Sequence, residues 1–236
     1  MCMPTTPRGE NVTYLTQTLA ALSKQMQGSV LADFVLTVVN TRPGQHPEFE
    51  NAKKVHAGNP SMKFHSLSTE QARWIDPDDT EVDNYNNPSN KPGPAVRRQN
   101  MDLTHVMQQC ASTHSTYTML LEDDFLPNSF ALKNIKSKIL LEQTKQDWKT
   151  MSFSFGMNGI VMRTNASFTQ FAQVLLKNYN VLPCDILVYT SDRSLAYAGR
   201  DIRHDRSAFR HIGKVSTFSF RNSEKFLSLY GKSRTF

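Results

Sequence analysis

The sequence of 236 residues contains only three cysteines, Cys2, Cys110 and Cys184. Three widely separated cysteines exclude a disulfide-rich scaffold and a CxxC zinc site. They allow one disulfide and leave one thiol, but their spacing does not indicate which two pair. No apolar run approaches the length that crosses a bilayer, and residues 1–8 lack the apolar segment of a signal peptide. We therefore expect no membrane insertion by this chain itself, which leaves open a domain of a longer, anchored protein.

Several nucleotide and metal motifs are also missing. There is no Walker P-loop, GxGxxG or HExxH pattern, so P-loop kinase, dinucleotide-binding and zinc-protease functions have no support. Hydrophobic residues make up 39% and charged residues 20%, a balance typical of a globular chain. The length fits one domain over residues 1–236. Within it we expect a mobile loop at 76–94, which is rich in Asn, Asp and Pro, and a flexible basic tail at 227–236.

The net charge of +6 is placed unevenly along the chain. Residues 200–236 contain nine Lys and Arg against three Asp and Glu, so this segment carries the whole excess. A basic segment can bind phosphate groups or nucleic acid. No RNA- or DNA-binding signature accompanies it, so we expect no nucleic-acid partner.

Apolar periodicity predicts alternating helices and strands. Helices are expected over residues 11–27, 98–111 and 168–178, with another that Asn128 or Ser129 caps and that ends near Glu142. Strands are expected at 34–39, 62–67 and 117–121, and two short ones within 151–162 on either side of residues 156–159. This alternation favours an α/β sandwich with a mostly parallel sheet.

An apolar strand near the middle of the chain ends in three acids, Glu122, Asp123 and Asp124. Ligands of open α/β sheets bind at the edge where the strands end. Carboxylates there are suited to a divalent cation whose other ligands come from a substrate's phosphates. A solvated acidic turn after a buried strand is the structural alternative.

Five segments recur in the order and spacing of one known family. They are Pro-Thr-Thr-Pro-Arg within 3–8, Arg-Arg-Gln-Asn-Met-Asp within 96–102, Leu-Leu-Glu-Asp-Asp at 120–124, Pro-Cys-Asp-Ile-Leu within 183–188, and Phe-Arg-His-Ile-Gly at 209–213. Together these segments resemble the glycoprotein 4-β-N-acetylglucosaminyltransferases. Their order and spacing carry the resemblance over most of the chain. One departure is Val188-Tyr189, where the family has Leu-Asp.

The resemblance implies a GT-A type glycosyltransferase with a Rossmann-like α/β/α fold, located in the Golgi lumen. It implies inverting transfer of GlcNAc from UDP-GlcNAc to a mannose of a glycoprotein N-glycan. Asp124 and His211 would be the metal ligands, and one oxygen and one imidazole ligand favour Mn²⁺ over Mg²⁺. Contacts to the nucleotide sugar would come from Thr5, Arg8, Arg98, Asn100, Glu122, Asp123, Arg210 and Lys214.

Inverting transfer needs a base for the acceptor hydroxyl. We expect Asp185 in that role, at the start of a helix after Pro183, with Asp123 as a second catalytic acid of the motif. Asp192 is the next choice for the base, and His204 and Asp205 are weaker ones. Two structural alternatives remain open. The negative charge of Asp185 can stabilise the N-terminus of its helix without any catalytic role, and Arg98 can pair with Asp102 one helical turn further on.

Other functions fit parts of the pattern. A related transferase could use another donor or a GPI-anchor glycan as acceptor, although the transferase that adds GalNAc to such anchors carries membrane helices within its domain. A domain that binds nucleotide sugar without turnover would keep the same fold. Two N-glycosylation sequons, Asn11-Val12-Thr13 and Asn165-Ala166-Ser167, fit a lumenal protein but are too common to decide the compartment.

Overall fold

The structure is a computed structural model, and it describes residues 1–9, 12–27, 33–77, 92–113, 115–145, 148–188, 200–204 and 208–214. Most of the loop expected at 76–94, the tail at 227–236, and Asn11, Asp192 and Asp205 lie outside these residues. Within them no helix has the length and apolarity that a membrane span requires.

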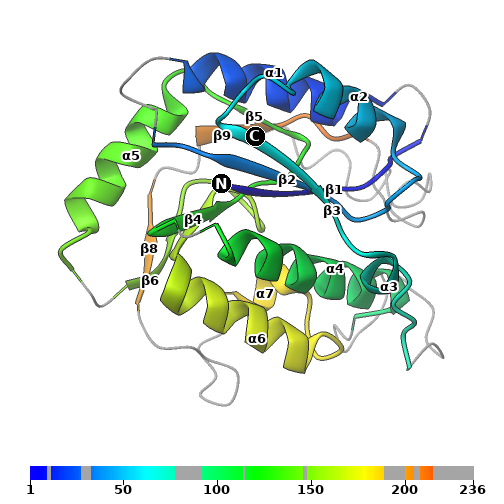
Figure 1. Ribbon diagram of the computed structural model, residues 1–236. Helices are drawn as coiled ribbons and strands as arrows, with labels where there is room; N and C mark the ends of the chain where they lie inside the picture. Colours follow the sequence, from blue (N-terminus) through cyan, green and yellow to red (C-terminus); the bar gives the residue numbers. More distant parts are fainter. Residues whose placement is uncertain are drawn as a thin grey trace.

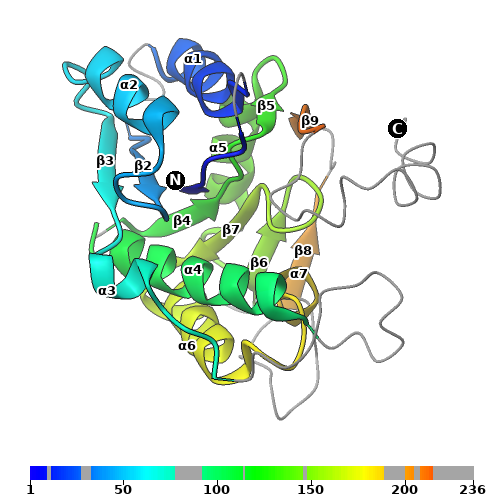
Figure 2. The same ribbon diagram turned by 90° about the vertical axis from the view of Figure 1, so that its right-hand side faces the viewer.

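A seven-stranded sheet forms the centre of the molecule, in the order β3-β2-β1-β4-β7-β6-β8 (Figure 1). The strands are β1 (Cys2–Thr5), β2 (Leu36–Asn40), β3 (Met62–Ser66), β4 (Tyr117–Leu120), β6 (Trp148–Ser152), β7 (Ile160–Arg163) and β8 (Arg200–Arg203). All run in one direction except β7, which pairs antiparallel with β4 and β6. The carboxyl ends of the six strands that run in the same direction therefore meet at one edge of the sheet, which faces the viewer in Figure 2.

Helices cover both faces of the sheet (Figure 1). One layer contains α1 (Tyr14–Met26), α2 (Pro47–Val55) and α5 (Ala131–Glu142). The opposite layer contains α4 (Pro94–Ala111), the π-helix η2 (Thr164–Phe168), α6 (Thr169–Asn178) and the short α7 (Cys184–Leu187). A single turn, α3 (Thr69–Ala72), follows β3. The predicted α/β/α sandwich with a mostly parallel sheet is confirmed.

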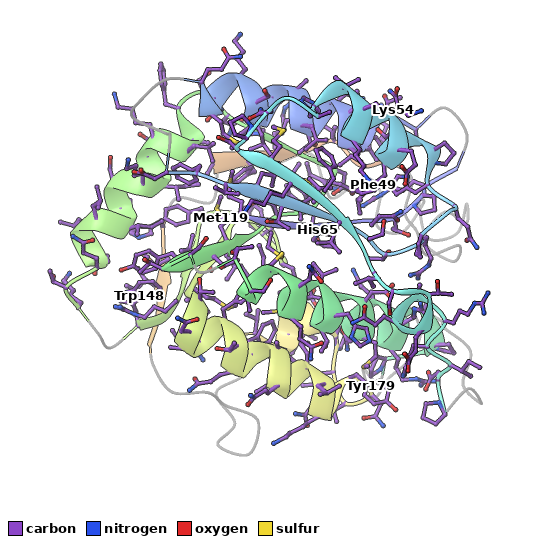
Figure 3. All side chains as sticks on the ribbon, in the orientation of Figure 1. Phe49, Lys54, His65, Met119, Trp148 and Tyr179 are labelled. Carbon is purple, nitrogen blue, oxygen red and sulfur yellow. A yellow bond between two sulfur atoms is a disulfide. The ribbon has the colours of Figure 1, made fainter. Side chains whose placement is uncertain are left out.

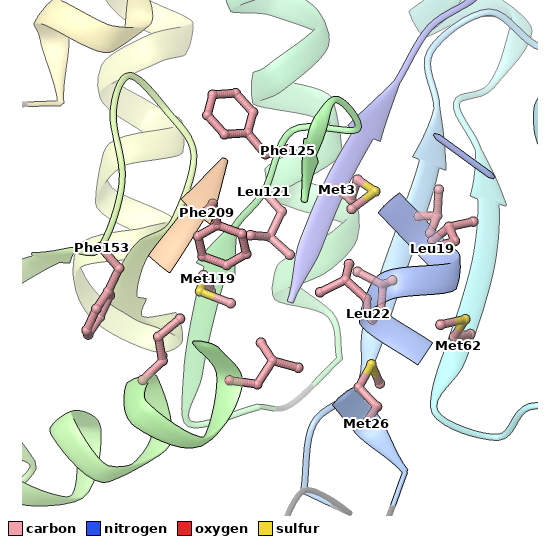
Figure 4. Close-up of a cluster of buried hydrophobic side chains, with 14 of the residues drawn as sticks. Met3, Leu19, Leu22, Met26, Met62, Met119, Leu121, Phe125, Phe153 and Phe209 are labelled. Carbon is pink, nitrogen blue, oxygen red and sulfur yellow. The ribbon is translucent and has the colours of Figure 1, made fainter. Parts of the chain in front are cut away.

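Each helix layer encloses its own hydrophobic cluster against the sheet. On the α1 side, Phe49 and Met119 point inwards while Lys54 points to solvent (Figure 3). Leu19, Leu22 and Met3 meet in the same cluster (Figure 4). Burying side chains of this size contributes roughly 1.5–3 kcal/mol each before the entropy cost of folding is counted.

A disulfide joins Cys2 on β1 to Cys110 near the end of α4, and Cys184 is buried as a free thiol. The sequence left this pairing open. The bridge therefore links α4 covalently to β1, which pairs with β2 and β4 at the centre of the sheet.

The starts of helices α4 and α5 differ from the prediction for local reasons. Helix α4 begins at Pro94, four residues before the predicted start, because proline is well placed in a first turn and Gly93 lies at the N-cap. Helix α5 begins after Phe130, in a left-handed conformation with φ 62°, instead of after a capping Asn128 or Ser129. The reason is that the preceding strand β5 (Phe125–Pro127) pairs with β9 (Phe209–His211), and the amide of Asn128 still donates to Ala208.

Candidate active site

A cavity of about 200 Å³ opens where β1 and β4 end. Its walls come from the chain after β1 and β2, from α4, and from the acidic motif. Of the predicted site residues, it brings together Thr5, Arg8, Arg98, Glu122 and Asp123. The N-terminal motif and the acidic motif, more than a hundred residues apart in sequence, are thus neighbours because β1 pairs with β4.

Asp123 is buried and held by a chain of hydrogen bonds. The hydroxyl of Thr5 donates to its Oδ2 at 2.6 Å, and Nε2 of His46 lies 2.9 Å from that hydroxyl. Because Thr5 has one hydroxyl hydrogen and the carboxylate accepts it, Nε2 of His46 must carry the hydrogen of the second bond. The hydroxyl of Thr18 on α1 also donates to the carbonyl of Asp123 at 2.8 Å. The carboxylate is therefore fixed in orientation.

Arg8 bridges the two aspartates of the motif. Its Nη2 lies 2.6 Å from Oδ1 of Asp123, and its Nη1 lies 2.8 Å from Oδ2 of Asp124. The guanidinium also lies over the ring of Tyr14, 5.6 Å from its centroid. A planar fork of donors suits two adjacent carboxylates better than an ammonium group does.

Asp124 meets His211 on the outer side of the motif, where Oδ2 of Asp124 and Nε2 of His211 are 3.2 Å apart. The β5–β9 ladder causes this approach, since Phe125 pairs with His211 and the amide of Ile212 donates to the carbonyl of Asp124 at 2.9 Å. Phe209, at the start of β9, anchors the ladder by packing near Leu121 and Met119 (Figure 4).

The three acids have different proton affinities. Burial and the charge of Asp124 raise the pKa of Glu122 to about 8, against the opposing charge of Arg8. Burial raises the pKa of Asp123 to about 6, again against Arg8. For Asp124, burial is outweighed by the hydrogen bond to His211 and the charge of Arg8, so its pKa lies below the usual value. Of the three acids, Asp124 ionises most readily and is therefore the carboxylate best suited to bind a cation.

The Asp124–His211 pair fits a divalent cation. Two neighbouring ligands of an octahedral ion with bonds of about 2.1 Å lie about 3 Å apart, close to the 3.2 Å between Oδ2 and Nε2. Gly213 packs directly against the pair, and only glycine fits there, because a Cβ would lie 2.1 Å from Oδ2 of Asp124 and 2.7 Å from Nε2 of His211. Within the described part of the chain, no group of three or more His, Cys, Asp or Glu is arranged to hold a metal. Further ligands would have to come from a substrate or water.

A second charged group lines the opposite wall of the cavity. Asp102 on α4 pairs with Arg98 at 2.9 Å and with Arg42 at 2.8 Å. Arg98 also donates to the carbonyls of Trp74 and Ala72. The helical Arg98–Asp102 pair considered from the sequence is therefore present, and Arg98 reaches the cavity as part of it.

Other predicted residues lie elsewhere. Asn100 is fully buried and does not line the cavity. Its Nδ2 donates to the carbonyls of Tyr179 and Leu182, and its Oδ1 accepts the amide of Cys184, so the side chain holds that loop. Arg210 and Lys214 are exposed beyond the cavity, and the amide of Lys214 donates to the hydroxyl of Tyr14.

Asp185 lies on α7 as predicted and is exposed. The preceding residue, Cys184, lines the cavity, and the charge of Asp185 adds to the effects of burial and of Asp124 on the pKa of Glu122. Asp185 therefore lies near the acidic motif. His204 follows β8 and stacks on Phe153, with ring centroids 4.9 Å apart.

The sequence did not indicate Arg42, His46 or Asn158 as site residues. Asn158 accepts the amide of Glu122 through Oδ1 at 3.0 Å and so helps to set the motif's backbone. A polar residue directly after a buried strand is the usual signal for such positions. Thr41 and Arg42 after β2 carried that signal.

No family model matches the chain. Among curated proteins, it is 33% identical over 139 residues to alpha-1,3-mannosyl-glycoprotein 4-beta-N-acetylglucosaminyltransferase C of Mus musculus. It is 31% identical over 141 residues to alpha-1,6-mannosyl-glycoprotein 4-beta-N-acetylglucosaminyltransferase of Gallus gallus. The alignments cover 57% of this chain but 27% and 28% of those relatives, so the chain spans about a quarter of their length. The resemblance found in the five motifs is confirmed.

Among solved structures, the chain is similar to S. aureus TarS 1-349 in complex with UDP-GlcNAc. The TM-score is 0.52 at 13% identity, and the match covers 97% of this chain and 64% of that one. A second structure of S. aureus TarS 1-349 gives a TM-score of 0.50 over 88% of this chain and 58% of that one. At this identity the likeness concerns the fold alone, and that fold is the predicted GT-A type.

Proposed function

We propose that this chain is the catalytic part of a glycosyltransferase that moves GlcNAc from UDP-GlcNAc to a mannose of an N-glycan, with inversion at the anomeric carbon. The observation that carries the proposal is the convergence of Arg8, Asp123, Asp124 and His211 at the edge where the parallel strands end. The named activity of the curated relatives supports the reaction, and the UDP-GlcNAc bound to a protein of the same fold supports the donor.

The donor would occupy the cavity between the acidic motif and α4. Arg42 and Arg98 on one wall and Arg8 on the other provide positive charge for the uridine diphosphate. Glu122 and Asp123 provide carboxyl oxygens that can accept hydrogen bonds from ribose or sugar hydroxyls. Since Thr5 and His46 hold Asp123, its acceptor oxygens are placed before the sugar arrives.

Asp124 and His211 would hold a divalent cation, and we propose Mn²⁺ over Mg²⁺ because the pair combines an oxygen with an imidazole. When bound, such an ion neutralises charge that develops on the departing diphosphate.

Asp185 would take the proton of the acceptor hydroxyl. In the transfer, the hydroxyl oxygen forms a bond to the anomeric carbon while the bond from that carbon to the phosphate oxygen of UDP breaks. The proton passes to the carboxylate of Asp185, and the bonding pair leaves with UDP. Because Asp185 is exposed, a hydroxyl can reach it from solvent. A base of this kind contributes on the order of 10²–10⁴-fold.

A lumenal location is part of the proposal. The Cys2–Cys110 disulfide fits an oxidising compartment such as the secretory pathway. In the second sequon, Asn165 is exposed. The Golgi lumen is the compartment that the relatives' reaction on glycoproteins suggests.

The proposal is tested by incubating the chain with UDP-GlcNAc, Mn²⁺ and a mannose-containing core N-glycan, and detecting a glycan heavier by one GlcNAc. We expect product with the wild type, and a loss of about a hundredfold or more with Asp185→Asn, which keeps the side chain's size but removes the base. UDP-GlcNAc binding should be the same for both proteins. Donor binding without product from the wild type would instead indicate a binding-only domain or another acceptor.

A further inference from the structure

The wall of the cavity formed by the end of β2 and by α4 carries a positive and a negative group side by side. Arg42 follows β2, Asp102 lies on α4, and both line the cavity. Nη1 of Arg42 lies 2.8 Å from Oδ2 of Asp102. A ligand at this wall therefore meets a hydrogen-bond donor next to a hydrogen-bond acceptor.

This pair is two strands away from the proposed metal ligands. Asp124 belongs to the motif that follows β4, and the sheet order places β1 between β4 and β2. Because neighbouring strands lie about 4.8 Å apart, the two places are separated by roughly 10 Å across the sheet. An extended nucleoside diphosphate has a length of this order. With its diphosphate at Asp124, its base can reach Arg42 and Asp102.

Asp102 is buried and held in one orientation. Its exposed fraction is 8%, and Nε of Arg98, one helical turn earlier, lies 2.9 Å from its Oδ1. Arg98 is fixed in turn by its bonds to the carbonyls of Trp74 and Ala72. Each carboxylate oxygen of Asp102 thus accepts one bond from an arginine, and each can accept a second one. The carboxylate is a preformed acceptor at the cavity wall.

Arg42 keeps donors for a ligand. Its contacts to Asp102 and to the carbonyl of Thr41, the latter at 2.7 Å, both use Nη1. Among the residues that the structure describes, Nε and Nη2 of Arg42 have no hydrogen-bond partner. Unused donors beside a buried acceptor form a directional pattern, which can distinguish ligands of equal charge.

We propose that Arg42 and Asp102 select uracil as the base of the nucleotide: Asp102 accepts the N3–H of the ring, and Arg42 donates to the adjacent carbonyl oxygen. This inference rests on the proposed function and assigns the base specificity of its donor site. Uracil presents a donor at N3 between two carbonyl acceptors, whereas cytosine presents an acceptor at N3 beside an amino donor. Cytosine would therefore turn a lone pair to the carboxylate and an amino group to the guanidinium, and neither could bond.

The test titrates UDP, CDP and N3-methyl-UDP into the full chain with Mn²⁺ by calorimetry. We expect the wild type to bind CDP at least about a hundredfold more weakly than UDP, because a site built around a substrate N–H discriminates strongly against a ligand without it. N3-methyl-UDP, in which a methyl group replaces the N3 hydrogen, should bind at least about tenfold more weakly than UDP.

Asp102→Asn and Arg42→Gln should each narrow the ratio of UDP to CDP affinity to about tenfold or less, because an amide offers both a donor and an acceptor. Arg42→Gln leaves Asp102 paired with Arg98, so it still decides the question if Asp102→Asn does not fold. Asp33→Asn is the matched control, since it removes a carboxylate from an ion pair with Lys136 but does not alter the cavity lining. Its ratio should equal that of the wild type.

Equal binding of UDP and CDP by the wild type would overturn the inference and leave the proposed function standing. Undiminished binding of N3-methyl-UDP, or a wild-type ratio in the folded variants, would overturn it in the same way. If the wild type does not bind UDP at all, the proposed function fails and the base selection fails with it.

Discussion

Arg8 and His211 approach the same oxygen of Asp124 from two sides: Nη1 of Arg8 lies 2.8 Å and Nε2 of His211 lies 3.2 Å from Oδ2. Arg8 also pairs with Asp123, so one guanidinium compensates two largely buried carboxylates. A divalent cation at Asp124 would supply the same kind of charge. Arg8 and the cation should therefore substitute for each other in stabilising the motif.

This relationship predicts the behaviour of Arg8→Gln. Leaving two buried carboxylates without their partner should lower the free energy of unfolding by about 3 kcal/mol. Mn²⁺ should then raise the thermal midpoint of the variant more than that of the wild type, because the ion replaces the lost charge. Thermal unfolding with and without Mn²⁺ measures both effects.

The control for that experiment is Arg163→Gln, whose guanidinium lies over the rings of Tyr117 and Trp148 instead of the motif. Its response to Mn²⁺ should equal that of the wild type. Equal responses of all three proteins would show that no cation binds beside Arg8.

Gly213→Ala should remove metal-dependent UDP binding without unfolding the chain. The added Cβ would fall 2.1 Å from Oδ2 of Asp124 and 2.7 Å from Nε2 of His211, so the pair must separate. Gly58→Ala is the matched control, because a Cβ at Gly58 meets nothing within 4 Å. Calorimetric titration of UDP in Mn²⁺ should show a loss of at least about tenfold for Gly213→Ala alone, and wild-type affinity in both variants would contradict the placement of the ion.

The pH dependence of stability should include a contribution from His46. Burial and the charge of Arg8 lower its pKa from an ordinary value of 6.5 to about 4 in the folded chain. Between these values the unfolded chain binds the proton and the folded chain does not, so stability is lost as pH falls from 6.5 towards 4. At about 1.4 kcal/mol per pKa unit, the loss reaches about 3 kcal/mol.

His46→Gln isolates this contribution, since glutamine can donate to Thr5 but does not titrate. The raised pKa values of Glu122 and Asp123 act in the opposite direction in both proteins and cancel in the comparison. Denaturant unfolding at pH 4.5 and pH 7 should therefore show the larger acid loss in the wild type. Parallel losses would mean that His46 is protonated in the folded chain.

The Cys2–Cys110 disulfide should stabilise the fold substantially, because it closes a loop across a sequence separation of 108 residues. Cys110→Ala should lower the free energy of unfolding by about 3 kcal/mol, and a reducing agent should have no further effect on that variant. Cys184→Ala should stay sensitive to reduction, as its thiol is free. Sensitivity of Cys110→Ala to reduction would point to a different pairing.

The regular spacing of apolar residues predicted most helices and strands, because that spacing reflects burial of one face of each element. Leu15, Leu19 and Leu22 on α1 are all fully buried, as their spacing indicated. Helix α2 was not predicted, since only Phe49 and Ala52 of its nine residues are buried and the apolar signal is sparse. Strands β5 and β9 are three residues each and depend on pairing with each other, which no local pattern reveals.

Site residues were predicted correctly where they belong to motifs that follow neighbouring strands and so lie at the same edge of the sheet. Thr5, Arg8 and Asp123 meet because β1 and β4 are neighbours. Asn100 shows the limit: a polar residue in a family-like motif was expected at the nucleotide, but its amide satisfies the backbone of the 179–184 loop. Buried amides usually have hydrogen-bond partners within the protein, and only the three-dimensional partners distinguish such a structural amide from one that binds a ligand.

The central claim is that Asp124 and His211 hold a divalent cation that binds the diphosphate of UDP. Calorimetric titration of UDP into the wild type and Asp124→Asn, each with Mn²⁺ and with a chelator, tests it most directly. The account predicts UDP binding by the wild type that requires Mn²⁺ and is lost in Asp124→Asn. UDP binding of equal strength in the chelator, or undiminished in Asp124→Asn, would contradict it.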